Sequence, residues 1–315
     1  MHRRDAVAAL LGGLVSPSVF NLDNVADERT PAPNFGGIER QVAGRLGVAV
    51  LDTATGRRLA YRADERFAMC STFKWLLGAQ ILARADAGTE RLSRVLPYGE
   101  KDLLEYAPVT RAHVREGGMT ISGLVSAAIQ YSDNTAANLL LQTVGGPASF
   151  TAYVGQLGDH ITRLDRVEPD LNSAIPGDAR DTTTPNAMVA NLRMVLLGDH
   201  LGRAARGQLV AWLVGNATGA DKLRAGLPAT WRVGDKTGMG AHGATNDVAV
   251  TWPVSREPIL VAAYLTETEA GVAGRNDALA KVGHAVGRWA QAAWCAMPPN
   301  QRQAKFRSIN VAERG

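Results

Sequence analysis

The sequence predicts an α+β fold: an antiparallel five-stranded sheet, flanked by helices and drawn from both chain ends, with an inserted all-helical subdomain. Two observations carry this prediction. Apolar and polar residues alternate on either side of a turn at 53–56, which indicates a hairpin of two strands. A long run of helical patterns then separates this hairpin from three more strand-like segments near the C-terminus.

The elements follow in order along the chain. A short amphipathic helix is expected at 35–45, and the hairpin strands at 47–52 and 58–62. Ala- and Leu-rich helical patterns, separated by Gly, Pro and Asp clusters, occupy 71–86, 120–130, 134–143, 147–156, 185–197 and 203–214. The later strands are expected at 231–237, 247–252 and 259–265, followed by a last helix at 275–294. The predicted sheet subdomain is therefore 31–65 with 216–296, the helical subdomain is 66–215, and a polar tail covers 297–315.

The composition is that of a folded protein with a substantial core: 46% of the 315 residues are hydrophobic and 20% are charged. The net charge of +4 is spread along the chain, without the basic block typical of nucleic-acid binding. The 6 histidines show no metal-ligand spacing, and the sequence contains no P-loop, dinucleotide fingerprint or haem motif. We therefore expect no metal, no cofactor and no nucleic-acid partner.

The first residues have the pattern of an export signal. Arg3 and Arg4 precede an apolar stretch at 6–15 that is too short to span a bilayer, and the signal with its spacer covers 1–30. This pattern predicts a periplasmic location, reached by the Sec or the twin-arginine route, with no membrane contact after export. An ordinary N-terminal helix is the alternative interpretation.

The two cysteines, Cys70 and Cys295, are separated by most of the chain. Cys70 stands at the start of an apolar helix, where a small buried thiol is the simplest interpretation. We therefore expect no disulfide.

Ser71 and Lys74 stand one helical turn apart and share one face of the helix predicted from residue 71. A lysine buried among Phe73, Trp75 and Leu76 has a lowered pKa and can accept the proton of a serine nucleophile. Taken alone, however, the motif is better explained by a capped, buried helix.

A second motif, Ser132-Asp133-Asn134, follows one apolar helix and opens another. Ser132 can relay a proton to a leaving group, and the Asn134 amide can donate to a substrate carbonyl. A turn or a helix cap has the same kind of sequence, so both interpretations stay open at this point.

The third motif, Lys236-Thr237-Gly238, lies on a predicted strand that runs into further glycines. Glycines pack poorly within strands but permit a substrate to approach closely. Lys236 and the Thr237 hydroxyl would bind a carboxylate. The backbone N–H groups of Ser71 and Met239 would form an oxyanion hole.

Ser-x-x-Lys, Ser-Asp-Asn and Lys-Thr-Gly, in this order, form a signature of class A β-lactamases and penicillin-binding proteins. From about residue 40 to 290 the chain resembles the class A serine β-lactamase family, within the serine β-lactamase and DD-peptidase superfamily. The resemblance implies the fold of that superfamily, and it places two of the 6 lysines in its two lysine positions.

A fourth stretch, from Arg166 to Asn172, resembles the Ω-loop of class A enzymes, in which a glutamate and an asparagine hold the hydrolytic water. The resemblance gives these roles to Glu168 and Asn172. It also implies a cis peptide bond before Pro169 and an ion pair between Arg166 and Asp181.

The resemblance also implies a set of substrate-binding residues. The family's usual arginine for the substrate carboxylate is missing, because Thr245 and Lys222 occupy its places, and Arg275 is a further candidate. The expected set is Tyr106, which would form one wall of the site, with Asn134, Thr237, Gly238, Thr245, Lys222 and Arg275.

The reaction implied is hydrolysis of the β-lactam ring of penicillins or cephalosporins, which confers antibiotic resistance, by a monomer that acts on small molecules. Ser71 would attack the lactam carbonyl, and either Lys74, or Glu168 through water, would take its proton. Ser132 would protonate the departing nitrogen. Glu168 with Asn172 would then direct water at the acyl-enzyme.

Two alternatives share this fold. A penicillin-binding DD-peptidase forms the same acyl-enzyme but releases it slowly, and a β-lactam sensor does not hydrolyse the ring. Glu168 with Asn172 argues against the DD-peptidase. The complete catalytic set argues against the sensor, since a sensor need not keep a deacylating base.

Overall fold

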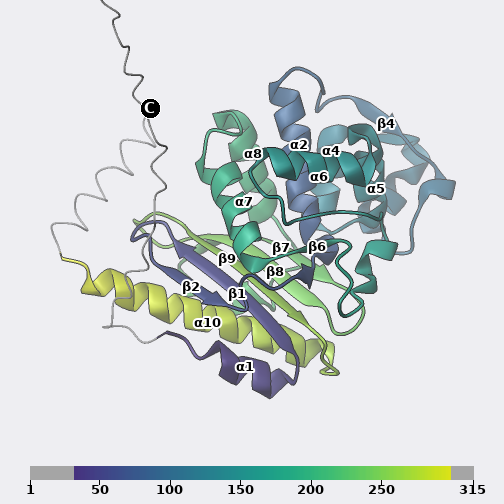
Figure 1. Cartoon of the computed structure of the whole chain (residues 1–315). Coiled ribbons are helices and arrows are strands. Elements are labelled where there is room, and N and C mark those ends of the chain that lie inside the picture. Colours follow the sequence, from purple (N-terminus) through teal and green to yellow (C-terminus); the bar gives the residue numbers. More distant parts are fainter. Residues whose placement is uncertain (1–31, 299–315) are drawn as a thin grey trace, which may run out of the picture.

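The computed structural model describes residues 32–298 (Figure 1). Its central sheet has five strands in the order β2-β1-β9-β8-β7, with every neighbouring pair antiparallel. The strands are β1 (Arg45–Asp52), β2 (Arg58–Tyr61), β7 (Arg232–Met239), β8 (Thr245–Trp252) and β9 (Ile259–Thr266). The predicted α+β fold is thus confirmed, with the N-terminal hairpin joined to the C-terminal strands through β1 and β9.

Both faces of the sheet are buried, and β9 shows this most clearly. Its even-numbered residues from Leu260 to Tyr264 join the hydrophobic cluster under the helical part of the molecule. Its odd-numbered residues from Ile259 to Leu265 join a second cluster on the opposite face. Side chains alternate between the two faces of a strand, so a strand covered on both sides reads as one continuous apolar run.

The helices divide between the two faces (Figure 1). One face is covered by α1 (Phe35–Val42) and α10 (Val272–Ala296), with the short α9 (Leu223–Gly226) against α10. On the other face α7 (Pro185–Leu197) contacts β1 and β9. The remaining helices are α2 (Phe73–Asp86), α3 (Pro108–His113), α4 (Ile121–Gln130), α5 (Asn134–Val144), α6 (Gly146–Gln156) and α8 (Arg203–Val214).

The central helix of this group is α2, in which every residue from Phe73 to Leu82 is buried. It contacts α4, α5, α6 and α8, so its entire N-terminal half lies inside the protein. Apart from Lys74 and Gln80, these buried residues are apolar or glycine, as expected of a helix that is buried on every side. The residues at its N-terminus are therefore held by packing on every side.

Several short elements were not predicted. Two-stranded ladders join β3 (Phe67–Ala68) to β6 (Thr182–Thr183) and β4 (Val95–Pro97) to β5 (Gly118–Thr120). Single 3₁₀ turns occur at η1 (Cys70–Thr72), η2 (Glu100–Asp102), η3 (Val114–Glu116) and η4 (Asp170–Ser173). The helix expected from residue 71 accordingly begins at Phe73, because η1 precedes it.

The predicted export signal, its spacer and residues 299–315 of the polar tail lie outside the described residues. Between residues 32 and 298, no helix combines the length and the apolar character that crossing a bilayer would need. The subdomain boundaries at 65/66 and 215/216 stay a prediction.

Candidate active site

Ser71 lies in the 3₁₀ turn η1, directly before α2. The turn is held by the Met69 carbonyl, which accepts hydrogen bonds from Thr72 Oγ1 at 2.9 Å and from Asn246 Nδ2 at 3.1 Å. Cys70 adopts a positive φ of 46°, a conformation that costs energy for a residue with a Cβ. The result is a serine that is 8% exposed and is fixed by the backbone around it.

Lys74 is completely buried and has three acceptors around its Nζ. They are the Ser132 carbonyl at 2.8 Å, Asn134 Oδ1 at 2.6 Å and Glu168 Oε1 at 2.9 Å. Burial lowers the pKa of Lys74, and the charge of Glu168 opposes that effect. A charged ammonium has three hydrogens for these three acceptors, whereas a neutral amine has only two.

Glu168, in the Ω-loop, contacts both Ser71 and Lys74. Its Oε1 accepts a hydrogen bond from Ser71 Oγ at 3.3 Å, and its Oε2 accepts one from Asn172 Nδ2. The peptide bond from Glu168 to Pro169 is cis, as the resemblance implied. The predicted trio of Ser71, Glu168 and Asn172 is therefore brought together, with Glu168 only 2% exposed.

The position of Glu168 depends on a residue that sequence reasoning missed. Asn138 Nδ2 donates to the Glu168 carbonyl at 2.8 Å, and Asn138 Oδ1 accepts from the Glu168 N–H at 2.9 Å. One amide side chain thus satisfies both backbone groups of Glu168. The available signal was its place on α5 one turn after Asn134, on the same face of the helix.

Ser132 faces the site from the turn between α4 and α5, with a positive φ of 59°. Its Oγ accepts a hydrogen bond from Lys236 Nζ at 3.1 Å. The neighbouring Asp133 is structural: its carboxylate accepts from the N–H groups of Thr110 at 2.8 Å and Ala136 at 2.9 Å. Asp133 therefore fixes the turn that presents Ser132 and Asn134.

Lys236 lies on β7 and is fully buried. Burial, together with the nearby charge of Lys74, lowers the pKa of Lys236 to about 7, while the charges of the buried Asp235 and Asp247 oppose the shift. The next residue, Thr237, places its Oγ1 2.5 Å from Thr218 Oγ1. Lys236 and Thr237 thus present a cation and a hydroxyl beside Ser132.

Two glycines allow β7 to pass close to the nucleophile. A Cβ on Gly238 would lie 2.7 Å from the Met69 carbonyl oxygen, and one on Gly240 would lie 2.6 Å from the Asn172 carbonyl oxygen and 2.7 Å from Cys70 Sγ. Real Cβ atoms do not approach this closely, so only glycine fits at either position. This close packing places the end of β7 against the turn that carries Ser71.

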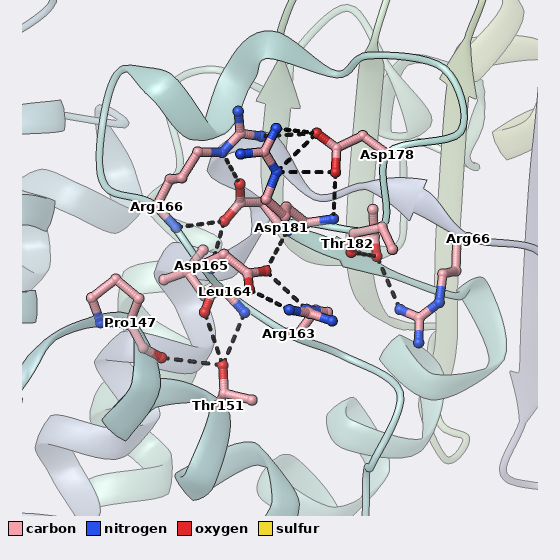
Figure 2. A network of polar contacts seen from close by, with 12 residues as sticks. Arg66, Pro147, Thr151, Arg163, Leu164, Asp165, Arg166, Asp178, Asp181 and Thr182 are labelled. Atoms are coloured by element: carbon pink, nitrogen blue, oxygen red, sulfur yellow. Dashed lines mark hydrogen bonds and ion pairs between the residues drawn. The ribbon is translucent and has the colours of Figure 1, made fainter.

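The Ω-loop is closed by polar contacts at its base (Figure 2). Arg166 Nε lies 2.6 Å from Asp181 Oδ2, which is the predicted ion pair. Asp181 Oδ1 also accepts the N–H groups of Asp165 at 2.7 Å and Arg166 at 2.9 Å. The buried Asp181 therefore joins the entry and the exit of the loop that carries Glu168.

The remaining candidates differ in where they lie. Tyr106 and Met239 are exposed, at 52% and 42%, as expected of residues on the rim of a site. Lys222 is buried, and its Nζ donates to the Thr218 carbonyl at 3.3 Å. Thr245 is buried opposite Met239 in the sheet, where its hydroxyl donates to the Gly243 carbonyl.

Arg275 is the candidate that the structure does not join to the others. It lies in the first turn of α10, and within residues 32–298 its Nε is buried without a hydrogen-bond partner. No hydrogen bond or ion pair links its side chain to another predicted site residue in that part of the chain. Of the two candidate cations besides Lys236, Lys222 is linked to Thr237 within residues 32–298, through its contact with Thr218.

Both cysteines are free, as predicted. Cys70 is buried beside Ala174 and Ala244, and this burial raises the pKa of its thiol to about 12. The side chain therefore acts as a small apolar residue beneath the nucleophile. Residues 32–298 contain no group of three or more His, Cys, Asp or Glu placed to hold a metal ion.

The comparisons with known proteins agree with this geometry. A model of the β-lactamase enzyme family matches residues 34–290. The chain is 51% identical over 243 residues to β-lactamase CTX-M-8 of Citrobacter amalonaticus, covering 77% of this chain and 83% of that relative. It is 50% identical over 259 residues to β-lactamase AST-1 of Nocardia asteroides, covering 82% and 83%.

Solved structures give the same result. An ancestral class A β-lactamase aligns with a TM-score of 0.79 and 61% identity, over 80% of this chain and 97% of that one. A putative class A β-lactamase from Rhodopseudomonas palustris aligns with a TM-score of 0.79 and 52% identity, over 81% and 97%. A serine, two lysines and a loop glutamate in one buried cluster, together with these similarities, show that the chain belongs to the class A β-lactamase family.

Proposed function

We propose that the protein hydrolyses β-lactam rings through an acyl-enzyme on Ser71, with Glu168 as the base that activates the deacylating water. The observation that carries this proposal is the single carboxylate of Glu168. Its Oε1 contacts both Ser71 Oγ, at 3.3 Å, and Lys74 Nζ, at 2.9 Å, while its Oε2 is held by Asn172. A group placed in this way can serve both half-reactions.

The hydrogen bonds of Lys74 favour one of the two acylation bases. Its three acceptors account for all three hydrogens of an ammonium, which leaves no lone pair for the Ser71 proton. We therefore assign the base to Glu168, which takes that proton along its hydrogen bond or through one bridging water. Lys74 then stabilises the ionised Glu168 before the reaction starts.

The remaining steps follow from the other contacts. The N–H groups of Ser71 and Met239 would stabilise the oxyanion formed when Ser71 attacks the lactam carbonyl. Ser132, at 3.1 Å from Lys236 Nζ, would give its proton to the lactam nitrogen as the C–N bond breaks and recover one from Lys236. The proton that Glu168 took from Ser71 would pass through solvent to Lys236, which leaves Glu168 ionised again. Glu168 would then take a proton from the water that attacks the ester carbonyl and pass it to Ser71 Oγ as that oxygen leaves.

The substrate would be anchored by its carboxylate and its side-chain amide. Lys236 and Thr237 offer a charge and a hydroxyl for the carboxylate, with Lys222 as a second cation nearby. Asn134 would donate to the amide of the substrate, since its Oδ1 is already occupied by Lys74. Tyr106 would form one wall of the site.

We further propose that the protein acts as an exported, periplasmic monomer. The apolar stretch at 6–15 behind Arg3 and Arg4 supports export. All side chains of the proposed mechanism come from one chain, so the chemistry requires no second copy.

Turnover of a chromogenic cephalosporin by the purified protein tests the hydrolytic function. We expect many turnovers per molecule, whereas a burst of one equivalent followed by no further product would indicate a DD-peptidase or a sensor. In Glu168→Ala, intact-mass spectrometry should show an acyl-enzyme that persists. Glu116→Gln is the matched control, because Glu116 is exposed and pairs only with His113 among the described residues. Unimpaired turnover by Glu168→Ala would remove Glu168 from its proposed role.

A further inference from the structure

Thr218 contacts the proposed carboxylate site but belongs to none of the motifs that predicted it. It lies in the loop between α8 and α9, and its Oγ1 is 2.5 Å from Thr237 Oγ1. Its carbonyl also accepts the Lys222 Nζ hydrogen bond at 3.3 Å. Thr218 therefore touches both the hydroxyl and the second cation offered to a substrate carboxylate.

The orientation of the adjacent Asn216 amide is fixed by two independent contacts. Asn216 Nδ2 donates to Asp235 Oδ2 at 2.6 Å, and Asp235 also pairs with Arg224, as an ionised carboxylate would. Asn216 Oδ1 accepts from the Thr218 backbone N–H at 3.0 Å. A flipped amide would place a donor against that N–H, so the oxygen of Asn216 faces Thr218.

The hydroxyl protons can then be counted. Thr218 Oγ1 lies 2.8 Å from Asn216 Oδ1, which can only accept, so the single proton of Thr218 points to Asn216. The 2.5 Å contact between the two threonines therefore uses the proton of Thr237. In the free protein, Thr237 donates to Thr218, and Thr218 donates to Asn216.

We propose that Thr218 is a positioning residue that turns the Thr237 proton away from the site, so that a substrate carboxylate binds only after this hydroxyl chain reverses. The proposal rests on the function proposed above. On binding, the Thr237 proton rotates to the carboxylate and the Thr218 proton rotates to Thr237 Oγ1. No covalent bond changes and no proton leaves its oxygen.

The surroundings make the reversal inexpensive. Asn216 Oδ1 loses the Thr218 hydroxyl but keeps the Thr218 backbone N–H, so no buried acceptor is left unpaired. The new bond from Thr237 to the carboxylate is charge-assisted, and donation from Thr218 to Thr237 polarises it. The orientation in the free protein, in which Thr237 donates to Thr218, nevertheless lowers the apparent affinity for carboxylates. Only the reversed orientation leaves the Thr237 proton free to bind a carboxylate.

A pair of reversible serine-directed probes tests the chain: phenylboronic acid and 3-carboxyphenylboronic acid, which differ only in the carboxylate. Thr218→Val keeps the shape of the side chain but removes the competing acceptor. We expect its inhibition constant for the carboxylated probe to fall by about threefold to tenfold, while that for phenylboronic acid is unchanged. Thr218→Ser, which keeps the hydroxyl, should show the wild-type ratio of the two constants.

Two outcomes would overturn the proposal. One is an equal change for both probes in Thr218→Val, which is what a merely structural role predicts; the other is an unchanged or weakened preference for the carboxylated probe. In a Thr237→Val background, Thr218→Val should have no further effect on the ratio, and an additive effect would also contradict the chain. Failure of the proposed function is distinguishable, since wild-type protein would then not turn over a cephalosporin, whatever its inhibition constants for the two boronic acids.

Discussion

Replacing Asn138 with alanine tests whether the Ω-loop glutamate is positioned by a helix that it does not belong to. The Asn138 side chain makes two hydrogen bonds, at 2.8 and 2.9 Å, with the carbonyl and the N–H of Glu168. Alanine removes both and leaves two backbone groups of a nearly buried residue without these partners. Nothing about the carboxylate itself is changed.

The expected size of the effect follows from those two bonds. A hydrogen bond contributes about 1 kcal/mol net, so the placed conformation of Glu168 loses about 2 kcal/mol. At 1.36 kcal/mol per factor of ten, turnover falls by as much as about thirtyfold. Because Glu168 is the proposed base in both half-reactions, kcat/KM and kcat should fall together.

The assay is steady-state hydrolysis of a penicillin, with intact-mass spectrometry to detect the acyl-enzyme and a thermal melt of each variant. Asn186→Ala is the matched control, because Asn186 lies on α7 and its side chain donates an exposed hydrogen bond to Asp64, which is not a proposed site residue. We expect it to retain wild-type turnover. If Asn138→Ala lost thermal stability but kept full turnover, the idea that Asn138 positions the base would be wrong.

Two further predictions concern β7. The lowered pKa of Lys236, about 7, means that its charge is present below that pH and is lost as the pH rises through it. For penicillins that carry a carboxylate, kcat/KM should therefore decline above about pH 7, measured from pH 5.5 to 9. Lys236→Arg, whose guanidinium stays charged, should move this decline to higher pH; an unshifted profile would assign the titration to another group. Gly238→Ala places a methyl 2.7 Å from the Met69 carbonyl oxygen, so β7 must move away from Ser71. Loss of one oxyanion donor costs about a hundredfold to a thousandfold in kcat, measurable with a chromogenic cephalosporin, and an unchanged kcat would place the oxyanion elsewhere.

The regular part of the fold was accessible from the sequence because its patterns are local. The five strands and the longer helices were predicted within a few residues of their observed ends, since alternation and helical periodicity are properties of short windows. The two-residue strands β3 and β6 were not, because a segment of that length has no period. Their pairing exists only because distant parts of the chain meet.

Some of the site residues could likewise be predicted from the sequence, and others could not. Ser71, Lys74 and Lys236 stand in short motifs, and a short motif can be recognised from a few neighbouring residues in the sequence. The roles of Asn138 and Thr218 cannot, because each depends on a partner that folding brings near: Glu168 is 30 residues from Asn138, and Thr237 is 19 from Thr218. The positive φ of Cys70 was equally inaccessible, since it is imposed by packing around the turn.

The pairing of β1 with β9 also sets the order in which this protein can be assembled. Arg45 pairs with Thr266 at one end of the ladder between β1 and β9, and the whole helical insertion lies between them in the chain. Contacts between residues so far apart must wait for a large loop to close, which slows folding. The sheet, and with it the strand that carries Lys236, therefore cannot be completed until nearly the entire chain has been synthesised. A chain shortened before β9 would lack the central partner of β1, and its active site could not form.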